Sequence, residues 1–254
     1  MNVEEYEKMY NQENTYWWFQ GRKHILFKMI RHYDLLKNGK ARVLDIGCGT
    51  GLILQGISGE SCAIGVDFSA KALSFCEKRN LKNLVRGDVR DLPIATSSVD
   101  LVLALDLLEH IEDDKGLMNE IRRVLRPEGY LLATVPAHRY LWSEHDEALH
   151  HYRRYSKTDF RDLVKKEGFT LIKYSYVISL TFLPILIFRL IQKACRFFKP
   201  SKNKPKTHII ILPEGLNALL IRILEMEAGI LKHQNFPFGV SLLCIAQKGA
   251  GFKR

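Results

Sequence analysis

The segment "VLDIGCGTG", Val43 to Gly51, constrains the fold most, because it joins an apolar run to a turn with alternate glycines. Glycine lets the backbone take a positive φ and approach a ligand closely, and a helix beginning after such a turn points free N–H groups at that ligand. A dinucleotide-binding turn reads GxGxxG, and Leu52 stands where its third glycine would be. The turn therefore predicts a nucleotide-like ligand and counts against a nicotinamide enzyme without excluding one.

Apolar runs alternate with helical patterns on both sides of this turn, and that alternation predicts a parallel sheet covered by helices. The expected strands are 42–46, 63–67, 83–87, 99–105, 130–135, 169–177 and 240–247, with helices near 51–57, 70–79 and 115–125 between them. Residues 1–40 are expected to form an N-terminal helical cap, which includes a helix over 22–36. A ligand-binding α/β domain is expected over 41–177 and 237–254, with an amphipathic helical insertion at 178–236.

Composition supports one domain with an insertion, since a 254-residue chain that is 46% hydrophobic can bury a large core. The five cysteines are scattered and form no CxxC pattern, so neither a disulfide framework nor a metal site is expected. The acidic start "MNVEEYEKMY" differs from the basic start and apolar core of a signal peptide. A cytoplasmic location is therefore expected.

Carboxylates follow the expected strands in order. Asp67 ends the second strand, where an ionised acid can accept from both ribose hydroxyls of an adenosine. Asp88 follows the third strand, placed to accept from an adenine amine, and Asp106, Glu109 and His110 follow the fourth. A single loop carboxylate is usually only solvated. The ordered set predicts a ligand at the carboxyl ends of the strands, where open α/β sheets bind ligands.

With these motifs the chain resembles the class I S-adenosylmethionine-dependent methyltransferases. The resemblance is carried by VLDIGCGTG, GVDFS, GDVRDLP, LDLLEH and RVLRPEGYLLATVP. It implies a Rossmann-like seven-stranded sheet whose last strand is antiparallel, with S-adenosylmethionine as cofactor. The implied cofactor-binding residues are Asp45, Gly47, Cys48, Gly49, Gly51, Asp67, Phe68, Asp88, Val89, Asp106 and Leu107.

The aromatic cluster Tyr16 to Phe19 is a further candidate part of the cofactor site. Trp18 could place its face near the sulfonium, and Arg22 could bind the methionine carboxylate. A hydrophobic staple of the first helices would have the same sequence.

Nucleic acid is an unexpected acceptor, because the Asn/Asp-Pro-Pro-aromatic tetrad of nucleobase amine methyltransferases is replaced by Asp106-Leu107-Leu108-Glu109 and no Pro-Cys pair is present. The LDLLEH region is similar to small-molecule methyltransferases, including quinone-biosynthesis enzymes. The segments YWWFQGR and WSEHDEALHHYRRYS resemble a group associated with lipid and cell-surface glycan pathways.

A hydroxyl acceptor benefits from losing its proton during methyl transfer, so a general base is expected near the fifth strand. His151 is the first candidate, His145 the second and His110 the third; each could instead be a hydrogen-bonded structural residue. Substrate binding is assigned to Arg153, Arg154 and Tyr155. The guanidinium groups of the two arginines could bind a phosphate or carboxylate on the substrate. The arginines could equally pair with Asp159 or Asp162 and order the next helix.

The insertion begins with an uncharged run, 174–188, which is shorter than the ~20 residues of a membrane-spanning helix. Basic residues then follow without an acidic one, and they carry most of the excess behind the net charge of +10: Arg189, Lys193, Arg196, Lys199, Lys202, Lys204 and Lys206. An apolar run with adjacent cations is typical of an element that docks on anionic lipid. A lid or a dimer interface is the alternative.

The sequence therefore predicts a methyltransferase, peripheral on the cytoplasmic face of a membrane, that methylates an oxygen of a lipid-like or lipid-linked small molecule. The alternatives are a soluble small-molecule methyltransferase, an RNA methyltransferase and a cofactor-binding protein without turnover. The sequence does not define an oligomeric state.

Overall fold

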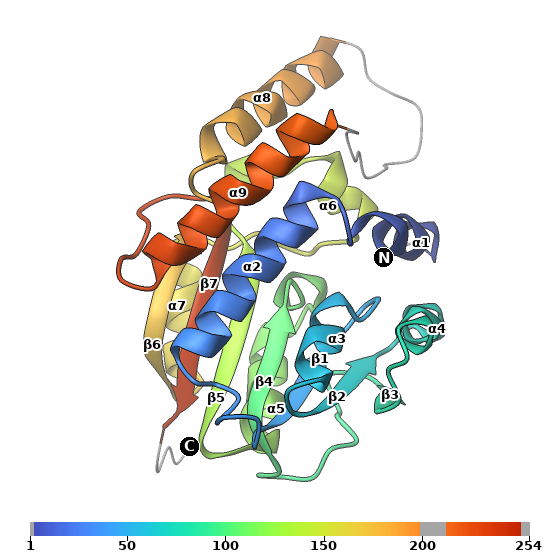
Figure 1. The fold of residues 1–254 in the computed structure, drawn as a ribbon. Helices are drawn as coiled ribbons and strands as arrows, with labels where there is room; N and C mark the ends of the chain where they lie inside the picture. Colours follow the sequence, from blue (N-terminus) through green and yellow to red (C-terminus); the bar gives the residue numbers. More distant parts are fainter. Residues whose placement is uncertain (1–2, 199–211, 250–254) are drawn as a thin grey trace.

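A computed structural model describes the backbone of residues 3–198 and 212–249 (Figure 1). Its centre is a seven-stranded sheet of order β3-β2-β1-β4-β5-β7-β6. The strands are β1 (Arg42–Ile46), β2 (Cys62–Asp67), β3 (Leu84–Arg86), β4 (Val99–Leu105), β5 (Leu125–Pro136), β6 (Phe169–Val177) and β7 (Ser241–Lys248). Strands β1 to β5 are parallel, whereas β7 runs antiparallel to both β5 and β6. The expected Rossmann-like sheet with an antiparallel last strand is confirmed.

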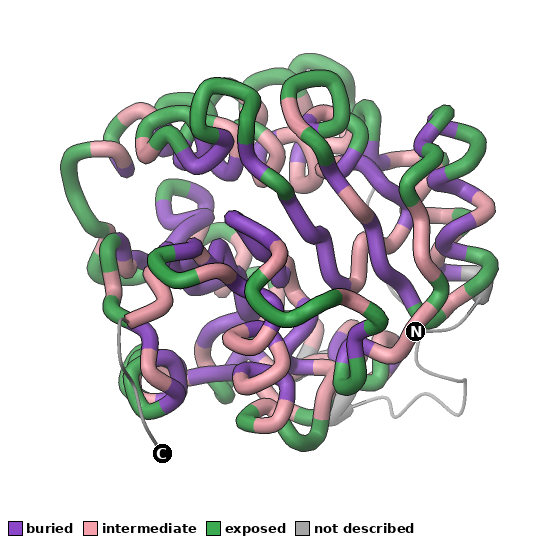
Figure 2. Tube along the Cα trace, turned by 90° about the horizontal axis from the view of Figure 1, so that it is seen from below, coloured by how far each residue is buried: buried purple, intermediate pink, exposed green. Residues whose placement is uncertain are grey.

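Helices cover both faces of the sheet (Figure 1). The described helices are α1 (Val3–Gln12), α2 (Trp17–His32), α3 (Leu52–Ser58), α4 (Ala70–Lys78), α5 (Asp114–Val124), α6 (Glu144–Ala148), α7 (Lys157–Lys166), α8 (Phe182–Phe198) and α9 (Glu214–Leu231). One core cluster joins the sheet to α5 and α7, and the other joins it to α2, α3 and α9. Figure 2 shows the buried strands between these two exposed helical layers. Strand order reverses between β1 and β4, so their carboxyl ends open a crevice for a ligand.

The insertion packs on the N-terminal helices. α9 crosses α2, and Gly21 of α2 lies directly against the buried side chain of Leu224. The Asn217 amide oxygen accepts from the backbone N–H of Trp17 (2.9 Å), and its NH₂ donates to the carbonyl of Thr15 (2.9 Å). The cap and the insertion therefore form one helical layer on the sheet.

Three predicted strands match the sheet residue for residue, namely Arg42–Ile46, Val99–Leu105 and Phe169–Val177, whereas β5 begins at Leu125, five residues before the predicted strand 130–135. The expected helix over 22–36 is wrong at both ends, since α2 covers Trp17–His32 and includes part of the aromatic cluster in its first turn. Two helices occupy the insertion as expected, and residues 199–211 between them lie outside the described part of the chain. No helix in the described residues is both long and apolar enough to span a bilayer.

Candidate functional site

The glycine turn between β1 and α3 forms the floor of the site. Gly47 has φ 68° and Gly51 has φ 83°, values that favour glycine. A Cβ atom on Gly47 would lie 2.8 Å from the Leu107 side chain, so a larger residue would close the turn against the loop after β4. The N–H groups of Gly47 and Cys48 donate to the carbonyl of Val66, which fixes the turn against β2.

Asp67 fixes the glycine turn through hydrogen bonds to the backbone. Its carboxylate accepts from the backbone N–H groups of Gly49 (2.9 Å) and Ser69 (2.8 Å). Burial raises the pKa of Asp67, while the two backbone donors act in the opposite direction. Asp45 lies below, 3% exposed, and burial together with the charge of Asp67 raises its pKa to about 8.

Asp88 sits beyond β3 and is engaged by Arg90. The guanidinium of Arg90 donates to both carboxylate oxygens at 2.6 to 3.1 Å, and this contact lowers the pKa of Asp88. Phe68, which is 70% exposed, and the buried Val89 lie in the same region and line the cavity.

Arg22 reaches from α2 to the carboxyl end of β4. It forms an ion pair with Asp106 and donates to the Thr134 hydroxyl (3.2 Å), which in turn donates to Asp106 (2.9 Å). The neighbouring guanidinium keeps the pKa of Asp106 below its usual range despite burial. A guanidinium and a carboxylate side by side can bind the carboxylate and the ammonium of an amino acid.

A cavity of about 2410 Å³ connects these groups with the loops after β4 and β5. Single-ligand sites usually measure about 300–1,000 Å³. The cavity can therefore hold a nucleoside cofactor together with a second, sizeable molecule. Its roof comes from α1, α2 and α8, so the cap and the insertion both border the ligand space.

A histidine and a carboxylate meet on the far side of this cavity. Asp146 of α6 is fully buried, and its carboxylate lies 3.0 Å from Nδ1 of His151. Arg154 donates to both oxygens of Asp146 (2.7 and 3.1 Å), and His151 and Arg154 hold the pKa of Asp146 far below its usual value in spite of burial. An ionised Asp146 fixes the proton on Nδ1 of His151 and leaves Nε2 as an acceptor.

Two more groups adjoin His151. The His110 ring stacks edge-on to it at 4.6 Å between centroids, and burial lowers the pKa of His110 to about 3. Glu109 is 1% exposed, and neither carboxylate oxygen has a hydrogen-bond partner among the described residues. Burial and the charge of Asp106 raise the pKa of Glu109.

Donor atoms of Glu109, His110 and His151 lie within 4.8 Å of one another, close enough to hold a divalent cation. No metal site was expected from the sequence, because its cysteines form no CxxC pattern and do not cluster with histidines.

His145 and Arg189 complete the wall. His145 of α6 is held neutral, since burial and the charge of Arg189 lower its pKa to about 4. Arg189 of α8 donates to the hydroxyl of Ser143 (2.5 Å).

The cavity brings together most of the residues named from the sequence. It is lined by Trp18, Arg22, Asp45, Gly47, Cys48, Gly49, Asp67, Phe68, Asp88, Val89, Asp106, Leu107, His110, His145, His151 and Arg154. Gly51, Arg153 and Tyr155 are not in the lining. Gly51 instead begins α3 and faces Leu81 and Cys76.

The three expected substrate-binding residues all have protein partners. Arg153 donates to Asp114 (2.9 Å) and to the carbonyl of Glu112, and the Tyr155 hydroxyl donates to Asp114 (2.8 Å). Arg154 is occupied by Asp146 and the carbonyl of Ala137. Neither Arg153 nor Arg154 pairs with Asp159 or Asp162, which were the alternative partners expected from the sequence.

Sequence reasoning missed Arg189 as a site residue and counted it only as part of a basic run. A signal was present: Ile185, Phe188, Arg189 and Gln192 share one face of α8 at helical spacing, and Arg189 is the cation among them. Glu13 was also missed, because its partners Thr50 and Arg79 are distant in sequence.

Residues 44–133 match a family model described as "Methyltransferase domain". The chain is 34% identical over 114 residues to a fatty-acid O-methyltransferase of Mycolicibacterium smegmatis, covering 42% of each protein. It is 25% identical over 169 residues to a ubiquinone biosynthesis O-methyltransferase of Cupriavidus pinatubonensis, covering 55% of this chain and 68% of that one. Across the first curated relatives, the chain spans 42% to 60% of their length.

The fold matches a solved structure of an S-adenosylmethionine-dependent methyltransferase from Archaeoglobus fulgidus with a TM-score of 0.57 at 21% identity, covering 89% of this chain and 94% of that one. The glycine turn, the carboxylates at the strand ends and the matched model lie on the same part of the sheet. Residues 44–133 are therefore similar to a methyltransferase domain, and the chain shares the fold of the Archaeoglobus fulgidus structure.

Proposed function

We propose that this protein transfers the methyl group of S-adenosylmethionine to an oxygen of a lipid-like acceptor, with His151 as general base. The observation that carries the proposal is the His151–Asp146 pair, which faces the same cavity as the glycine turn. Methyl transfer is an in-line displacement, so one continuous cavity for donor and acceptor is the first requirement.

The cofactor is proposed to lie over the glycine turn with its ribose at Asp67 and its adenine near Phe68 and Asp88. Its amino-acid end would meet the Arg22–Asp106 pair, where both of its charges find a partner. This orientation would direct the methyl group toward the loops that carry His110 and His151.

The base would act through Nε2 of His151. Asp146 holds the Nδ1 proton, and as the acceptor oxygen attacks the methyl carbon its proton passes to Nε2. The ionised Asp146 stabilises the imidazolium that forms. The leaving group is S-adenosylhomocysteine, so atoms and charge balance without a further reactant.

Substituting His151 by Ala should lower turnover about 100-fold or more while leaving S-adenosylhomocysteine affinity unchanged. Asp146→Asn is less informative, because it also leaves Arg154 unpaired. His150→Ala, one residue away in the same loop, is the matched control and should retain activity. Normal turnover in His151→Ala would refute its role as base and leave metal-assisted or uncatalysed proton loss, which an assay with and without EDTA would separate.

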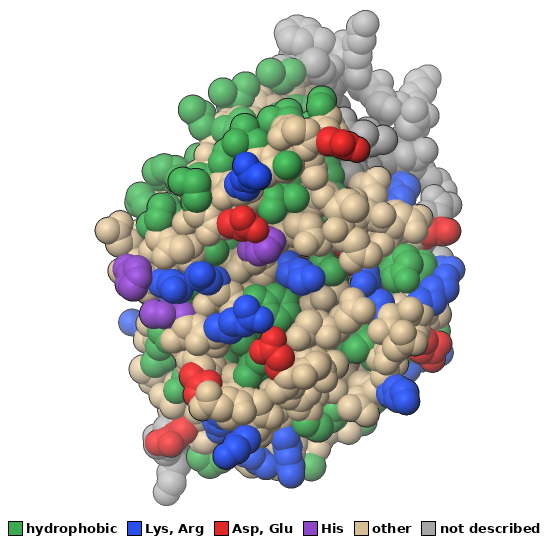
Figure 3. Space-filling model, viewed as in Figure 1, with side chains coloured by type: hydrophobic (Ala, Val, Ile, Leu, Met, Phe, Trp, Pro, Cys, Tyr) green, Lys and Arg blue, Asp and Glu red, His purple; other side chains and the backbone are tan. Residues whose placement is uncertain are grey.

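The membrane part of the proposal rests on the outer face of the insertion. Apolar side chains are exposed along α8 and α9, among them Leu183 (62%), Leu190 (52%) and Leu219 (53%). Figure 3 shows hydrophobic side chains gathered over the region where α8 and α9 lie in Figure 1. The basic run that follows Arg189 in the sequence is complementary to anionic headgroups.

Flotation with phosphatidylglycerol vesicles tests this docking. The full chain should float with the vesicles, and binding should weaken as salt rises. Leu183→Gln combined with Leu190→Gln should reduce flotation, whereas Ile172→Gln, an exposed apolar residue on β6, should not. If the chain did not float with the vesicles and formed a dimer in sedimentation velocity, this face would instead be a subunit interface.

A further inference from the structure

Arg189 carries a half-buried guanidinium that forms no ion pair with a carboxylate among the described residues. It projects from α8 into the cavity, and its one described hydrogen bond goes to the Ser143 hydroxyl (2.5 Å). A guanidinium has five N–H donors, so most of its capacity is unused within the described structure. Burial lowers the pKa of Arg189, as does the nearby charge of Arg154.

Asp146, the acid whose charge acts on Arg189, already accepts hydrogen bonds from other groups. Asp146 receives two hydrogen bonds from Arg154, one contact from His151 and the N–H and hydroxyl of Ser143. The Ser143 hydroxyl accepts from Arg189 and donates to Asp146, so it gives Arg189 a hydrogen bond but no negative charge. A buried cation without a counter-ion is costly, and the cost falls when an anion binds beside it.

The surroundings of Arg189 define what kind of anion fits. His145 is close enough for the charge of Arg189 to lower its pKa, and as a neutral imidazole it can donate one hydrogen bond to an anion. Apolar side chains of α8 and α9 line the same cavity, namely Ile185, Phe188 and Leu220. The cavity wall thus offers the guanidinium of Arg189 and the neutral imidazole of His145 together with apolar side chains of α8 and α9.

We propose that Arg189 binds an anionic headgroup, a phosphate or a carboxylate, on the acceptor, whose apolar chain lies between α8 and α9. This deepens the proposed function, on which it rests, by naming the acceptor as an anionic amphiphile. It also moves anion recognition from Arg153 and Arg154, whose donors have protein partners, to a residue of the insertion.

Calorimetric titration of the full chain, saturated with S-adenosylhomocysteine, tests the assignment with three probes: dodecyl phosphate, inorganic phosphate and dodecanol. Dodecyl phosphate should bind, and Arg189→Gln should weaken that binding about 10- to 100-fold, the usual effect of losing a charge-assisted hydrogen-bonded contact. Dodecanol affinity should not change. If inorganic phosphate bound as tightly as dodecyl phosphate, the site would recognise a free anion. That result would overturn the proposal that the acceptor is an amphiphile.

Arg222→Gln is the matched control, since it removes the same charge from the exposed side of α9, outside the cavity. Arg189→Lys keeps the charge and should retain part of the affinity. Equal dodecyl phosphate affinity in Arg189→Gln and Arg222→Gln, or no binding to the unmodified chain, would overturn the proposal. S-adenosylhomocysteine affinity reports separately on folding and on the methyltransferase assignment, so the two proposals fail independently.

Discussion

Asp45 is the residue whose protonation should respond most directly to the cofactor. Its carboxyl lines the cavity below the glycine turn, and its pKa is raised to about 8 by burial and by Asp67. At pH 7 it is therefore mostly protonated in the free protein. The cofactor's ammonium group, held at the Arg22–Asp106 pair of the same cavity, brings a positive charge toward Asp45, which favours its ionised form and lowers that pKa.

Cofactor binding at pH 7 should thus release up to about one proton, and affinity should increase between pH 6 and 8. Calorimetry of S-adenosylhomocysteine binding in buffers with different ionisation enthalpies measures this release. Asp45→Asn should abolish it. Asp88→Asn should not, because Arg90 already holds the pKa of Asp88 low. Equal release by both variants would contradict a role for Asp45.

Sequence and structure agree on the carboxylates at strand ends and differ on Arg153 and Arg154 in the loop after β5. Asp67 and Asp106 both line the cavity, because strand ends fix where a short side chain can reach. Arg153 and Arg154 find their partners in Asp114 and Asp146, which depends on how loops meet in three dimensions. No local pattern contains that information.

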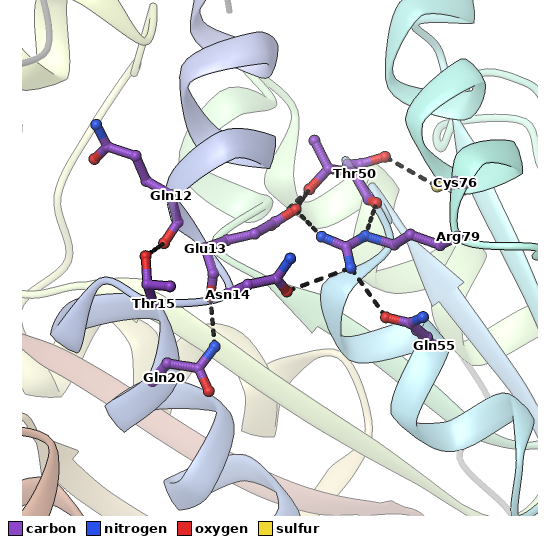
Figure 4. A network of polar contacts seen from close by, with 10 residues as sticks. Gln12, Glu13, Asn14, Thr15, Gln20, Thr50, Gln55, Cys76 and Arg79 are labelled. Carbon is purple, nitrogen blue, oxygen red and sulfur yellow. Dashed lines mark hydrogen bonds and ion pairs between the residues drawn. The ribbon is translucent and has the colours of Figure 1, made fainter.

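Among the elements, α1 is attached to the glycine turn through a buried ion pair. Figure 4 shows Glu13, just after α1, between Thr50 and Arg79. The Thr50 hydroxyl donates to Glu13 (2.7 Å), and Arg79 donates to Glu13, to the Thr50 carbonyl (2.9 Å) and to Gln55 (2.9 Å). The network ties the cap to the turn that would bind the cofactor.

Glu13→Ala should lower the free energy of unfolding by about 3–5 kcal/mol, because it leaves the buried Arg79 without its counter-ion. It should also weaken S-adenosylhomocysteine binding, since the turn loses a fixed neighbour. Arg31→Ala breaks the exposed Arg31–Glu60 pair and should cost less than about 1 kcal/mol. Urea denaturation compares the two variants, and equal effects would show that the Glu13 pair is not a structural tie.

The crossing of α2 and α9 depends on a glycine. A Cβ atom on Gly21 would lie 2.8 Å from Cβ of the buried Leu224. Gly21→Ala should destabilise the protein by about 1–3 kcal/mol through overpacking, although alanine is the better helix former. Gly229→Ala on α9 meets nothing within 4 Å and should stabilise by about 0.5–1 kcal/mol. Thermal unfolding of the pair should show shifts of opposite sign.

At the scale of the whole molecule, the sheet could be predicted and the helical roof could not. Strand positions follow from short apolar runs between turns, which are local signals. The packing of α9 on α2 joins segments about 200 residues apart, through contacts such as that of Asn217 with Trp17. Contacts between such distant segments produce no periodic pattern in the sequence. The cap and the insertion could therefore be predicted as separate helical segments but not as one layer.

The free energy of unfolding of the whole chain should depend on pH, because burial lowers the pKa of histidines in the folded state. Burial lowers the pKa of His145 to about 4 and that of His110 to about 3, from an ordinary value of 6.5. Between pH 6.5 and 4 the unfolded chain therefore binds more protons than the folded one, and the free energy of unfolding decreases as pH falls. This stability is fully present above pH 6.5. Buried acids with raised pKa, such as Glu13 and Glu227, act in the opposite direction, so the profile of the unmodified chain mixes both effects.

Comparison with a variant isolates the histidine contribution. His145→Gln should flatten the decline between pH 6.5 and 4 by up to about 3 kcal/mol, since each pKa unit corresponds to about 1.36 kcal/mol. His24→Gln removes an imidazole that is 43% exposed and serves as the matched control. Urea titrations at half-unit pH steps provide the free energies. Parallel curves for His145→Gln and the unmodified chain would mean that His145 becomes protonated in the folded state, where Arg189 and Arg154 would then need an anion beside them.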